Sequence, residues 1–315
     1  MDPVSHLIFD VESVADGDLI AAVKYPEEGL SSEAAIERFQ AELVEQSGKT
    51  FIPYTFQIPT AVVIAKVGRD LDLIDIVSLD DPDFRPHVIT ENFWRGWELY
   101  GRPQWVTFNG RGFDLPLMEL AAFRYGLSIP VWFNLGGPSY KQCRNRYNTD
   151  AHFDLHEFLT NFNATWFRGG LDLAAQLVAK PGKMAIKGDQ VQEMYRRGEL
   201  QQISDYCRCD VLDTYFVFLR SMVVMGRINR RREQELVHAA HDWLEQRRDS
   251  NPGYVAYLDR WADWVDPWTS PPSPEHSSLT RNVSQDDSTA QGQGEPPDSG
   301  ESATGGGSND SGSGT

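Results

Sequence analysis

The fold of this chain is set by a short run near its start, LIFDVES at residues 7–13. The run opens with apolar side chains and ends in acidic ones, which is typical of a buried strand with carboxylates at one end. Asp10 and Glu12 stand two positions apart, and alternate side chains of a strand point to the same face. The pair can therefore hold one or two cations. Asp-x-Glu also occurs at solvated strand ends, so the pair alone does not decide between the two interpretations.

Neighbouring segments supply partners for this strand. Residues 60–67 and 71–77 are β-branched runs on either side of the turn residues 68–70, which is the composition of a hairpin. We expect them to lie antiparallel beside the first strand. Short strands are also predicted at residues 105–108 and 153–155. Helical spacing of apolar residues predicts helices at residues 32–46 with Ser32 as N-cap, 90–100, 114–125, 172–178 and 203–225.

A second motif, FNGRGFDLP at residues 108–116, predicts a turn that leads into a helix. Two glycines allow tight turns, and Asp114 then stands where the helix begins. There it could be an N-cap that accepts hydrogen bonds from the first free amides, which Pro116 in the first turn also favours. It could equally be a metal ligand. Asn109 and Phe113 are candidates for substrate contact, and Asn109 could instead brace its turn.

A third motif, YCRCDVLDTY at residues 206–215, lies near the start of the longest predicted helix. Tyr206 and Asp210 are four positions apart, so the phenol and the carboxylate share one helical face. Taken singly, the pair is also explained by a core tyrosine and a surface acid. The order and spacing of the three motifs together favour a common site.

In that order and spacing the motifs resemble the DEDDy branch of the DnaQ-like exonucleases. More narrowly, the chain resembles stand-alone proteins related to the exonuclease domain of family-B DNA polymerases. The resemblance covers about residues 7–220, and YCRCDVLDTY is similar to the whole third motif of that group. The chain departs from the group in an insertion at about residues 15–49 and in an extension after about residue 226.

The resemblance implies an α/β fold, an RNase H-like mixed sheet whose first three strands are antiparallel and which carries helices on both faces. It implies two divalent ions, Mg²⁺ or Mn²⁺, which all-oxygen ligands also favour. Asp10 would bridge both ions, and Tyr206 would position the attacking water. The metal-binding residues would be Asp10, Glu12, Asp114 and Asp210. Independently of any family, two carboxylates about 4 Å apart repel by roughly 4 kcal/mol at an effective dielectric of 20, so such a cluster needs a cation.

The activity implied is that of a 3′–5′ exonuclease, which releases nucleoside monophosphates from the 3′ end of single-stranded DNA. RNA is the alternative substrate, because the same kind of site can serve either sugar. A protein of a different class, a nucleic-acid-binding module that has lost catalysis on the same fold, also remains open.

Charge and cysteine content exclude several classes of protein. A net charge of -17 argues against a protein that coats nucleic acid through positive charge. No stretch reaches the roughly 18 apolar residues of a membrane span, and no signal-peptide pattern is evident, so we expect a cytoplasmic protein. Cys143, Cys207 and Cys209 lack paired zinc-site spacing and are expected to be reduced thiols.

Three regions are expected along the chain. Residues 1–226 would form the exonuclease domain, and residues 227–269 a helical C-terminal extension. Residues 270–315 are acidic, rich in Ser, Gly and Pro, and poor in large apolar side chains, so we predict that they are disordered. The extension carries as much acid as base, so its tryptophans are predicted to pack on the core rather than to stack on bases. They are Trp243, Trp261, Trp264 and Trp268.

Several other polar residues have more than one interpretation. Asp154 follows the last predicted strand and could lie near the site, although a structural or capping role is favoured. His152 and His156 flank it and are interpreted as structural. Two basic clusters could guide a single strand by its phosphates or could form solvated loops. They are Lys141, Arg144 and Arg146, and Lys180, Lys183 and Lys187.

Overall fold

The structure is a computed structural model that describes residues 3–182 and 190–269. The tail predicted to be disordered, residues 270–315, lies outside the described residues, and so do Lys183 and Lys187. Residues up to Trp264 belong to one compact unit. No helix in the described ranges combines the length and the apolar composition needed to cross a membrane. The three cysteines are free thiols, as predicted.

A five-stranded sheet forms the centre of the unit, in the order β3-β2-β1-β4-β5. β1 pairs antiparallel with β2, and β2 pairs antiparallel with β3. β1 pairs parallel with β4, which in turn pairs parallel with β5. The predicted RNase H-like arrangement, with three antiparallel strands first, is confirmed. The strands are β1 Val4–Ala15, β2 Gln57–Gly68, β3 Leu73–Ser78, β4 Gln104–Thr107 and β5 His152–Asp154.

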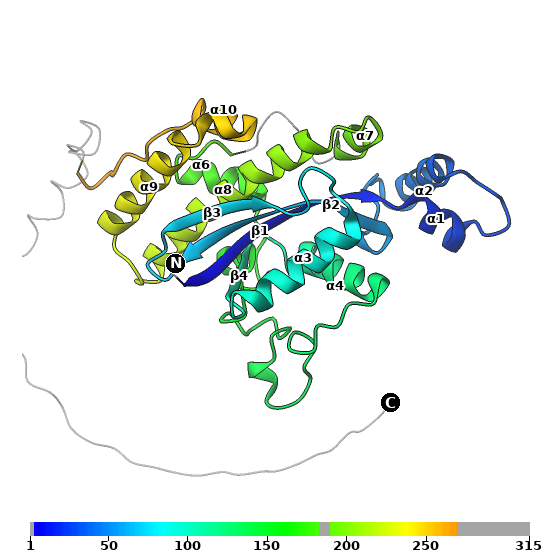
Figure 1. The fold of residues 1–315 in the computed structure, drawn as a ribbon, viewed down its shortest axis with the longest axis horizontal. Helices are drawn as coiled ribbons and strands as arrows, with labels where there is room; N and C mark the ends of the chain where they lie inside the picture. The colour runs from blue at the N-terminus through cyan, green and yellow to red at the C-terminus, as the bar shows by residue number, and fades with distance from the viewer. Residues whose placement is uncertain (1–2, 183–189, 270–315) are drawn as a thin grey trace, which may run out of the picture. The chain divides into compact units, whose positions relative to one another are not determined.

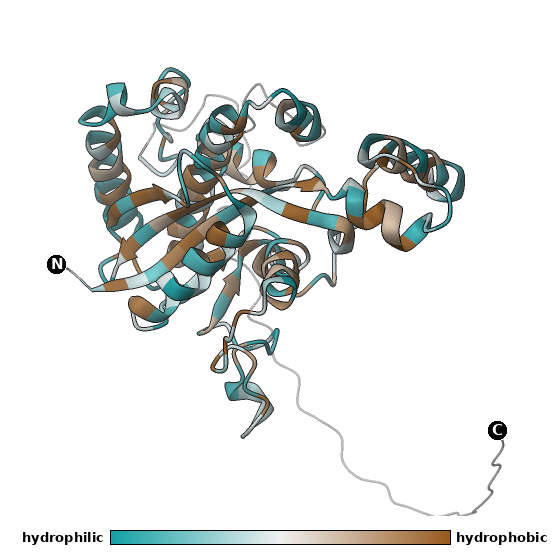
Figure 2. Ribbon diagram, turned by 45° about the vertical axis from the view of Figure 1, so that its right-hand side comes forward, coloured by the Kyte–Doolittle hydropathy of each residue, from teal (hydrophilic) through white to brown (hydrophobic). Residues whose placement is uncertain are grey.

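Helices cover both faces of the sheet (Figure 1). One face carries α6 (Gly170–Leu177), the long α8 (Leu200–Val224) and α9 (Arg230–Glu245). The other carries α3 (Pro86–Leu99) and α4 (Asp114–Tyr125). Each face buries its own hydrophobic cluster, and Figure 2 shows the apolar residues concentrated along the strands and on the helix surfaces beside them. The sheet is therefore buried on both sides, which explains the long apolar runs of β1 and β2.

The insertion after β1 forms a separate helical pair, α1 (Gly17–Lys24) and α2 (Ser32–Ser47), beyond the end of the sheet (Figure 1). The two helices share a small apolar cluster with Ile52. α1 was not predicted. The expected N-cap of α2 was wrong by one position, because the hydroxyl of Ser31 accepts the amide of Ala34 while Ser32 is already helical.

The C-terminal helices α9 and α10 (Pro252–Leu258) pack against α8 in the same apolar cluster. Trp243 donates its indole N–H to the carbonyl of Ile74 at 3.2 Å. Trp261 lies with its ring 5.3 Å from that of Phe216. Packing on the core is confirmed for these two tryptophans, but it is wrong for Trp268, which is 79% exposed. The division of the chain at residues 226 and 227 stays a prediction. The remaining short helices are α5 Leu155–Thr160 and α7 Val191–Arg196, with 3-10 turns at Tyr54–Phe56, Ser139–Lys141 and Arg248–Ser250.

Candidate active site

Side chains on one face of β1 enter the hydrophobic core, and acidic side chains on the other face belong to the candidate site. Phe9 and Val11 belong to the apolar cluster under α3 and α4. Because strand side chains alternate, Asp10 and Glu12 project to the opposite face, toward α8. There both are partly buried rather than solvated. The interpretation of this pair as an ordinary exposed strand end is therefore wrong.

α8 brings the third motif over these carboxylates. Ligand oxygens of Asp10, Glu12 and Asp210 all lie within 4.8 Å of one another. Tyr206, one helical turn before Asp210, is 8% exposed. The structure thus joins residues separated by about two hundred positions, and Asp210 is not the isolated surface acid of the alternative interpretation.

Asp114 lies near this group but is not one of the three residues whose ligand oxygens lie within 4.8 Å of one another. It is the first residue of α4, as predicted, but the N-cap position belongs to Phe113 and has no side-chain cap. The carboxylate instead accepts the backbone amide of Val11 at 3.0 Å. The N-cap interpretation of Asp114 is therefore wrong. Because β1 and β4 run parallel, the turn after β4 reaches the same sheet end as the carboxylates of β1.

Asp154 organises the turn that leads into α4. Its carboxylate accepts the backbone amides of Asn109 at 3.0 Å and of Arg111 at 2.8 Å. It also caps α5 by accepting the amides of His156 and Glu157. The favoured capping role is confirmed, and the same carboxylate lies close enough to the site to raise the pKa of Asp114.

The turn between β4 and α4 requires a glycine and a residue with left-handed backbone conformation. Asn109 has a φ of 65°, a conformation that asparagine tolerates better than most residues. A Cβ on Gly110 would lie 2.6 Å from the side chain of Thr107. The chain can therefore leave β4 and begin α4 within a few residues, which brings Asp114 back to β1.

Burial perturbs the acids of the site. Desolvation, and next the charge of Asp114, raises the pKa of Asp10 above its ordinary value. The thiol of Cys207 lies 3.5 Å from Asp10 Oδ2 and opposes that shift. Burial also raises the pKa of Asp114. For Tyr206, burial first and the charge of Asp210 next raise the pKa, so the phenol is held neutral. Such mutually repelling buried carboxylates are what a bound cation would relieve.

The donor set fits a hard divalent cation. All three grouped side chains offer carboxylate oxygen, the ligand type that Mg²⁺ and Mn²⁺ prefer. The thiol of Cys207 lies 3.5 Å from Asp10 Oδ2, and its pKa is raised well above its ordinary value by burial and then by Asp10, so it stays protonated. A protonated thiol is not a metal ligand. The site is therefore suited to oxygen-bound metal rather than to zinc held by thiolate.

A groove of about 830 Å³ runs beside Glu12 and is lined by both predicted substrate-contact residues, Asn109 and Phe113. It is also lined by Phe51, which sequence analysis did not identify. Phe51 is 62% exposed, and its ring centroid lies 5.7 Å from that of Phe113. It was missed because it lies between the insertion and the predicted hairpin, outside every motif. The signal in the sequence is an aromatic residue that directly follows the polar residues 47–50.

Three members of the two basic clusters are committed to other contacts. Arg144 pairs with Glu119 at 2.7 Å, and Arg146 pairs with Glu157 at 2.5 Å. Lys180 is 2% exposed and donates to the carbonyl of Ala262. The expectation that Lys180 forms part of a solvent-facing cationic surface is wrong, because its stem is buried beneath α8 and its charge lies 4.0 Å from the ring of Trp261.

The histidines near Asp154 are structural, as interpreted. His152 is fully buried, and its Nε2 lies 2.7 Å from the hydroxyl of Thr107. Burial lowers its pKa, so the ring is neutral. His156 lies edge-on to the ring of Phe108 at 5.8 Å.

Comparison with known proteins places this chain in a family. One similar solved structure is the family B DNA polymerase from the hyperthermophilic archaeon Pyrobaculum calidifontis, with 16% identity and a TM-score of 0.42 over 70% of this chain. The match spans 25% of the polymerase chain. No curated protein matches. The family model described as "Predicted 3'-5' exonuclease related to the exonuclease domain of PolB" matches residues 49–261. Since that match covers more than half of the 315 residues, the chain belongs to this family of predicted 3′–5′ exonucleases.

Proposed function

We propose that this protein is a two-metal-ion exonuclease that removes nucleoside monophosphates from the 3′ end of single-stranded DNA. The observation that carries the proposal is the convergence of Asp10, Glu12 and Asp210, whose ligand oxygens lie within 4.8 Å of one another. A sheet strand and a long helix supply these residues, so the group is held on rigid elements.

Four carboxylates would hold the metal ions. Asp10, Glu12 and Asp210 form the close group, and Asp114 approaches from the start of α4. In the proposal Asp10 would be a ligand of the metal ions together with Glu12 and Asp210, and Asp114 would contribute a further carboxylate. When bound, two divalent cations supply charge to stabilise the developing negative charge and help to activate water.

Tyr206 is the proposed positioning residue for the attacking water. Its phenol is neutral and shares the helical face of Asp210. A neutral hydroxyl can donate or accept a hydrogen bond without adding negative charge beside the phosphate.

The strand end would lie in the groove beside Glu12. Phe51 and Phe113 offer aromatic surface there, and bases of any sequence stack on such rings. Asn109 lines the same groove and offers an amide for the sugar or base edge. Stacking in place of base-edge readout suits an enzyme that must process every sequence. The relation of the family to a polymerase exonuclease domain favours DNA over RNA.

The test is digestion of matched 3′-labelled single-stranded DNA, duplex DNA and RNA with Mg²⁺. We expect labelled mononucleotide, released fastest from single-stranded DNA. Faster release from RNA would establish the exoribonuclease alternative. A retained complex without cleavage, in Mg²⁺ and in Mn²⁺, would establish the binding-module alternative.

A further inference from the structure

A second cavity, of about 660 Å³, lies at the opposite end of the sheet from the acidic group. β1 contributes His6 to it, at the start of the strand, α8 contributes Met222 near its end, and Met225 is the C-cap of that helix. His6 precedes Asp10 by four residues, which is about 13 Å along a strand. The cavity is therefore separate from the proposed catalytic site.

Cationic side chains gather at this cavity in an otherwise acidic chain. Arg69, Arg227 and Arg232 line it, together with the carboxylates Asp70 and Asp150. Within the described residues neither Arg69 nor Arg227 lies within ion-pair distance of an acid. Arg232 is partly neutralised by Glu235 at 3.4 Å, and it also donates to the carbonyl of Asp70. Two guanidinium groups thus remain available for an anion.

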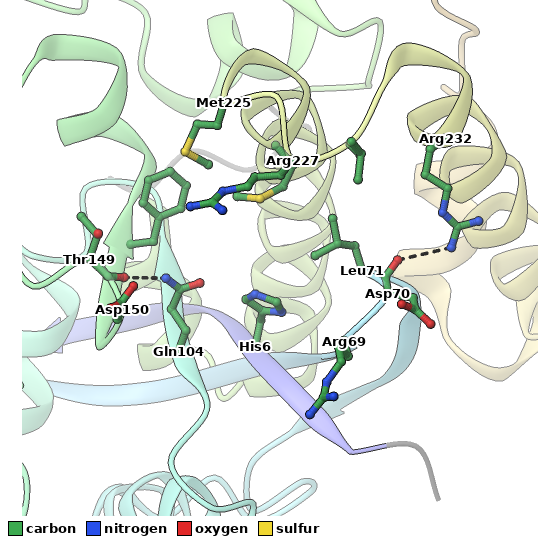
Figure 3. A pocket seen from close by; sticks show the side chains of 13 residues that line it. His6, Arg69, Asp70, Leu71, Gln104, Thr149, Asp150, Met225, Arg227 and Arg232 are labelled. Atoms are coloured by element: carbon green, nitrogen blue, oxygen red, sulfur yellow. Dashed lines mark hydrogen bonds between the residues drawn. The ribbon is translucent and has the colours of Figure 1, made fainter.

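Within the described part of the chain, one buried polar atom at this cavity has no hydrogen-bond partner, whereas Gln104 donates to the carbonyl of Thr149 (Figure 3). Arg227 reaches across the cavity in that view, with His6 and Gln104 on the opposite side. Nδ1 of His6 is buried and has no hydrogen-bond partner among the described residues. An unpaired buried polar atom is costly unless a ligand or water satisfies it.

Apolar side chains form another part of the lining. They are Leu71, Phe153, Met222, Met225 and Ile228. Methionine side chains adapt to flat ligands and make favourable contacts with aromatic rings. A cavity of this size that combines apolar side chains with a few polar groups can accommodate a small molecule.

From these observations we propose that the cavity binds a small phosphate-bearing ligand of nucleotide size, with its phosphate held by Arg227 and its base against the two methionines. Arg69 also lines the cavity and adds to the attraction. The site does not depend on the proposed exonuclease activity.

The test is calorimetric titration of the full chain with 2′-deoxyadenosine 5′-monophosphate in EDTA, so that no metal-dependent binding at the acidic group contributes. The Asp210→Ala protein is titrated in parallel and should bind equally well. Arg227→Glu should weaken binding about tenfold or more, the size of one lost charge-assisted contact. Arg231→Glu is the matched control, since Arg231 is 88% exposed on α9 and does not line the cavity.

Three outcomes would overturn the proposal. One is no binding at millimolar nucleotide. Another is equal affinity in Arg227→Glu and Arg231→Glu, with both proteins shown to be folded by circular dichroism. The third is inorganic phosphate binding as tightly as the nucleotide, because the apolar wall would then contribute nothing. Tighter binding of the nucleotide than of either phosphate or deoxyadenosine alone is the expected result.

Discussion

Asp114 Oδ1 accepts a hydrogen bond from the backbone amide of Val11 at 3.0 Å, across 103 positions of sequence. Val11 stands between Asp10 and Glu12, so this bond ties the start of α4 to the strand that carries the other acids. It uses one oxygen of Asp114. The backbone of β1 therefore sets the spacing between the acid of the second motif and those of the first.

Asp210→Ala and Tyr206→Phe should separate metal binding from water positioning. If Asp210 holds metal, its loss should cost at least about 4 kcal/mol of transition-state stabilisation, a fall near a thousandfold in rate. Tyr206→Phe keeps the ring and removes one hydrogen bond, so we expect a loss of about tenfold to a few hundredfold with metal still bound. Single-turnover rates and Mn²⁺ titrations check both. Near-normal activity in a folded Asp210→Ala protein would refute the assignment.

Metal affinity should rise with pH. In the metal-free protein the pKa values of Asp10 and Asp114 are raised by burial, so near pH 6 a cation must displace protons. Affinity should increase until the pH exceeds those raised values and then level off. Mn²⁺ calorimetry at several pH values, in buffers of different ionisation enthalpy, counts the protons released. Affinity independent of pH, with no proton release, would contradict this expectation.

The ligand set also predicts the response to chelators. EDTA should abolish nuclease activity and Mg²⁺ or Mn²⁺ should restore it, because the proposed ligands are all oxygen. A chelator selective for zinc should have no effect. Full activity in EDTA would exclude the two-metal mechanism.

Asp154→Ala should damage the site without touching a proposed ligand. The 3% exposed carboxylate holds four backbone amides, and its loss leaves buried donors unpaired. We expect about 2–4 kcal/mol of lost unfolding free energy and a large fall in activity. Denaturant unfolding and single-turnover rates check this. Asp249→Ala, an exposed acid, is the control and should change neither. Wild-type rates in Asp154→Ala would show that the turn holds Asp114 unaided.

Phe51→Ala should raise KM for single-stranded DNA while kcat changes little, because stacking at the groove aids binding more than chemistry. The expected loss is about 1–3 kcal/mol, the range of one base–aromatic contact. Phe123→Ala is the matched control, since Phe123 is 85% exposed on α4 and does not line this groove. Equal KM values in the two variants would remove Phe51 from the substrate path.

Asp213 predicts a pH dependence of stability. Burial raises its pKa to about 8 in the folded chain, although the phenol of Tyr257 donates to it at 2.7 Å. The folded state therefore binds a proton that the unfolded state has released. Stability should fall as the pH rises between about 4 and 8, by up to about 1.4 kcal/mol per pH unit from this group. Asp213→Asn stays neutral and should show a shallower slope in denaturant unfolding. Asp249→Asn should match the wild type, and an unchanged slope in Asp213→Asn would show that Asp213 is ionised.

Short sequence patterns correctly predicted the features that depend only on neighbouring residues. The β-branched runs around residues 68–70 predicted a hairpin, and the chain pairs β2 with β3 there. The turn at residues 109–112 predicted a helix beginning at Asp114, and α4 begins at that residue. Alternation along β1 predicted that Asp10 and Glu12 share a face. Each of these features depends on backbone preference or on a period of two, which neighbouring residues alone express.

Long-range contacts decided the rest. The sequence by itself determined which acids could converge, but their separation of at most 4.8 Å exists only because α8 crosses β1. The role of Asp154 likewise depends on amides more than forty positions away, and that of Phe51 on a ring contact with Phe113. Side chains of these types occur throughout the chain without such partners. The burial of apolar surface on both faces of the sheet determines which of these side chains come together. That burial involves residues from the whole chain, so no short stretch of sequence predicts it.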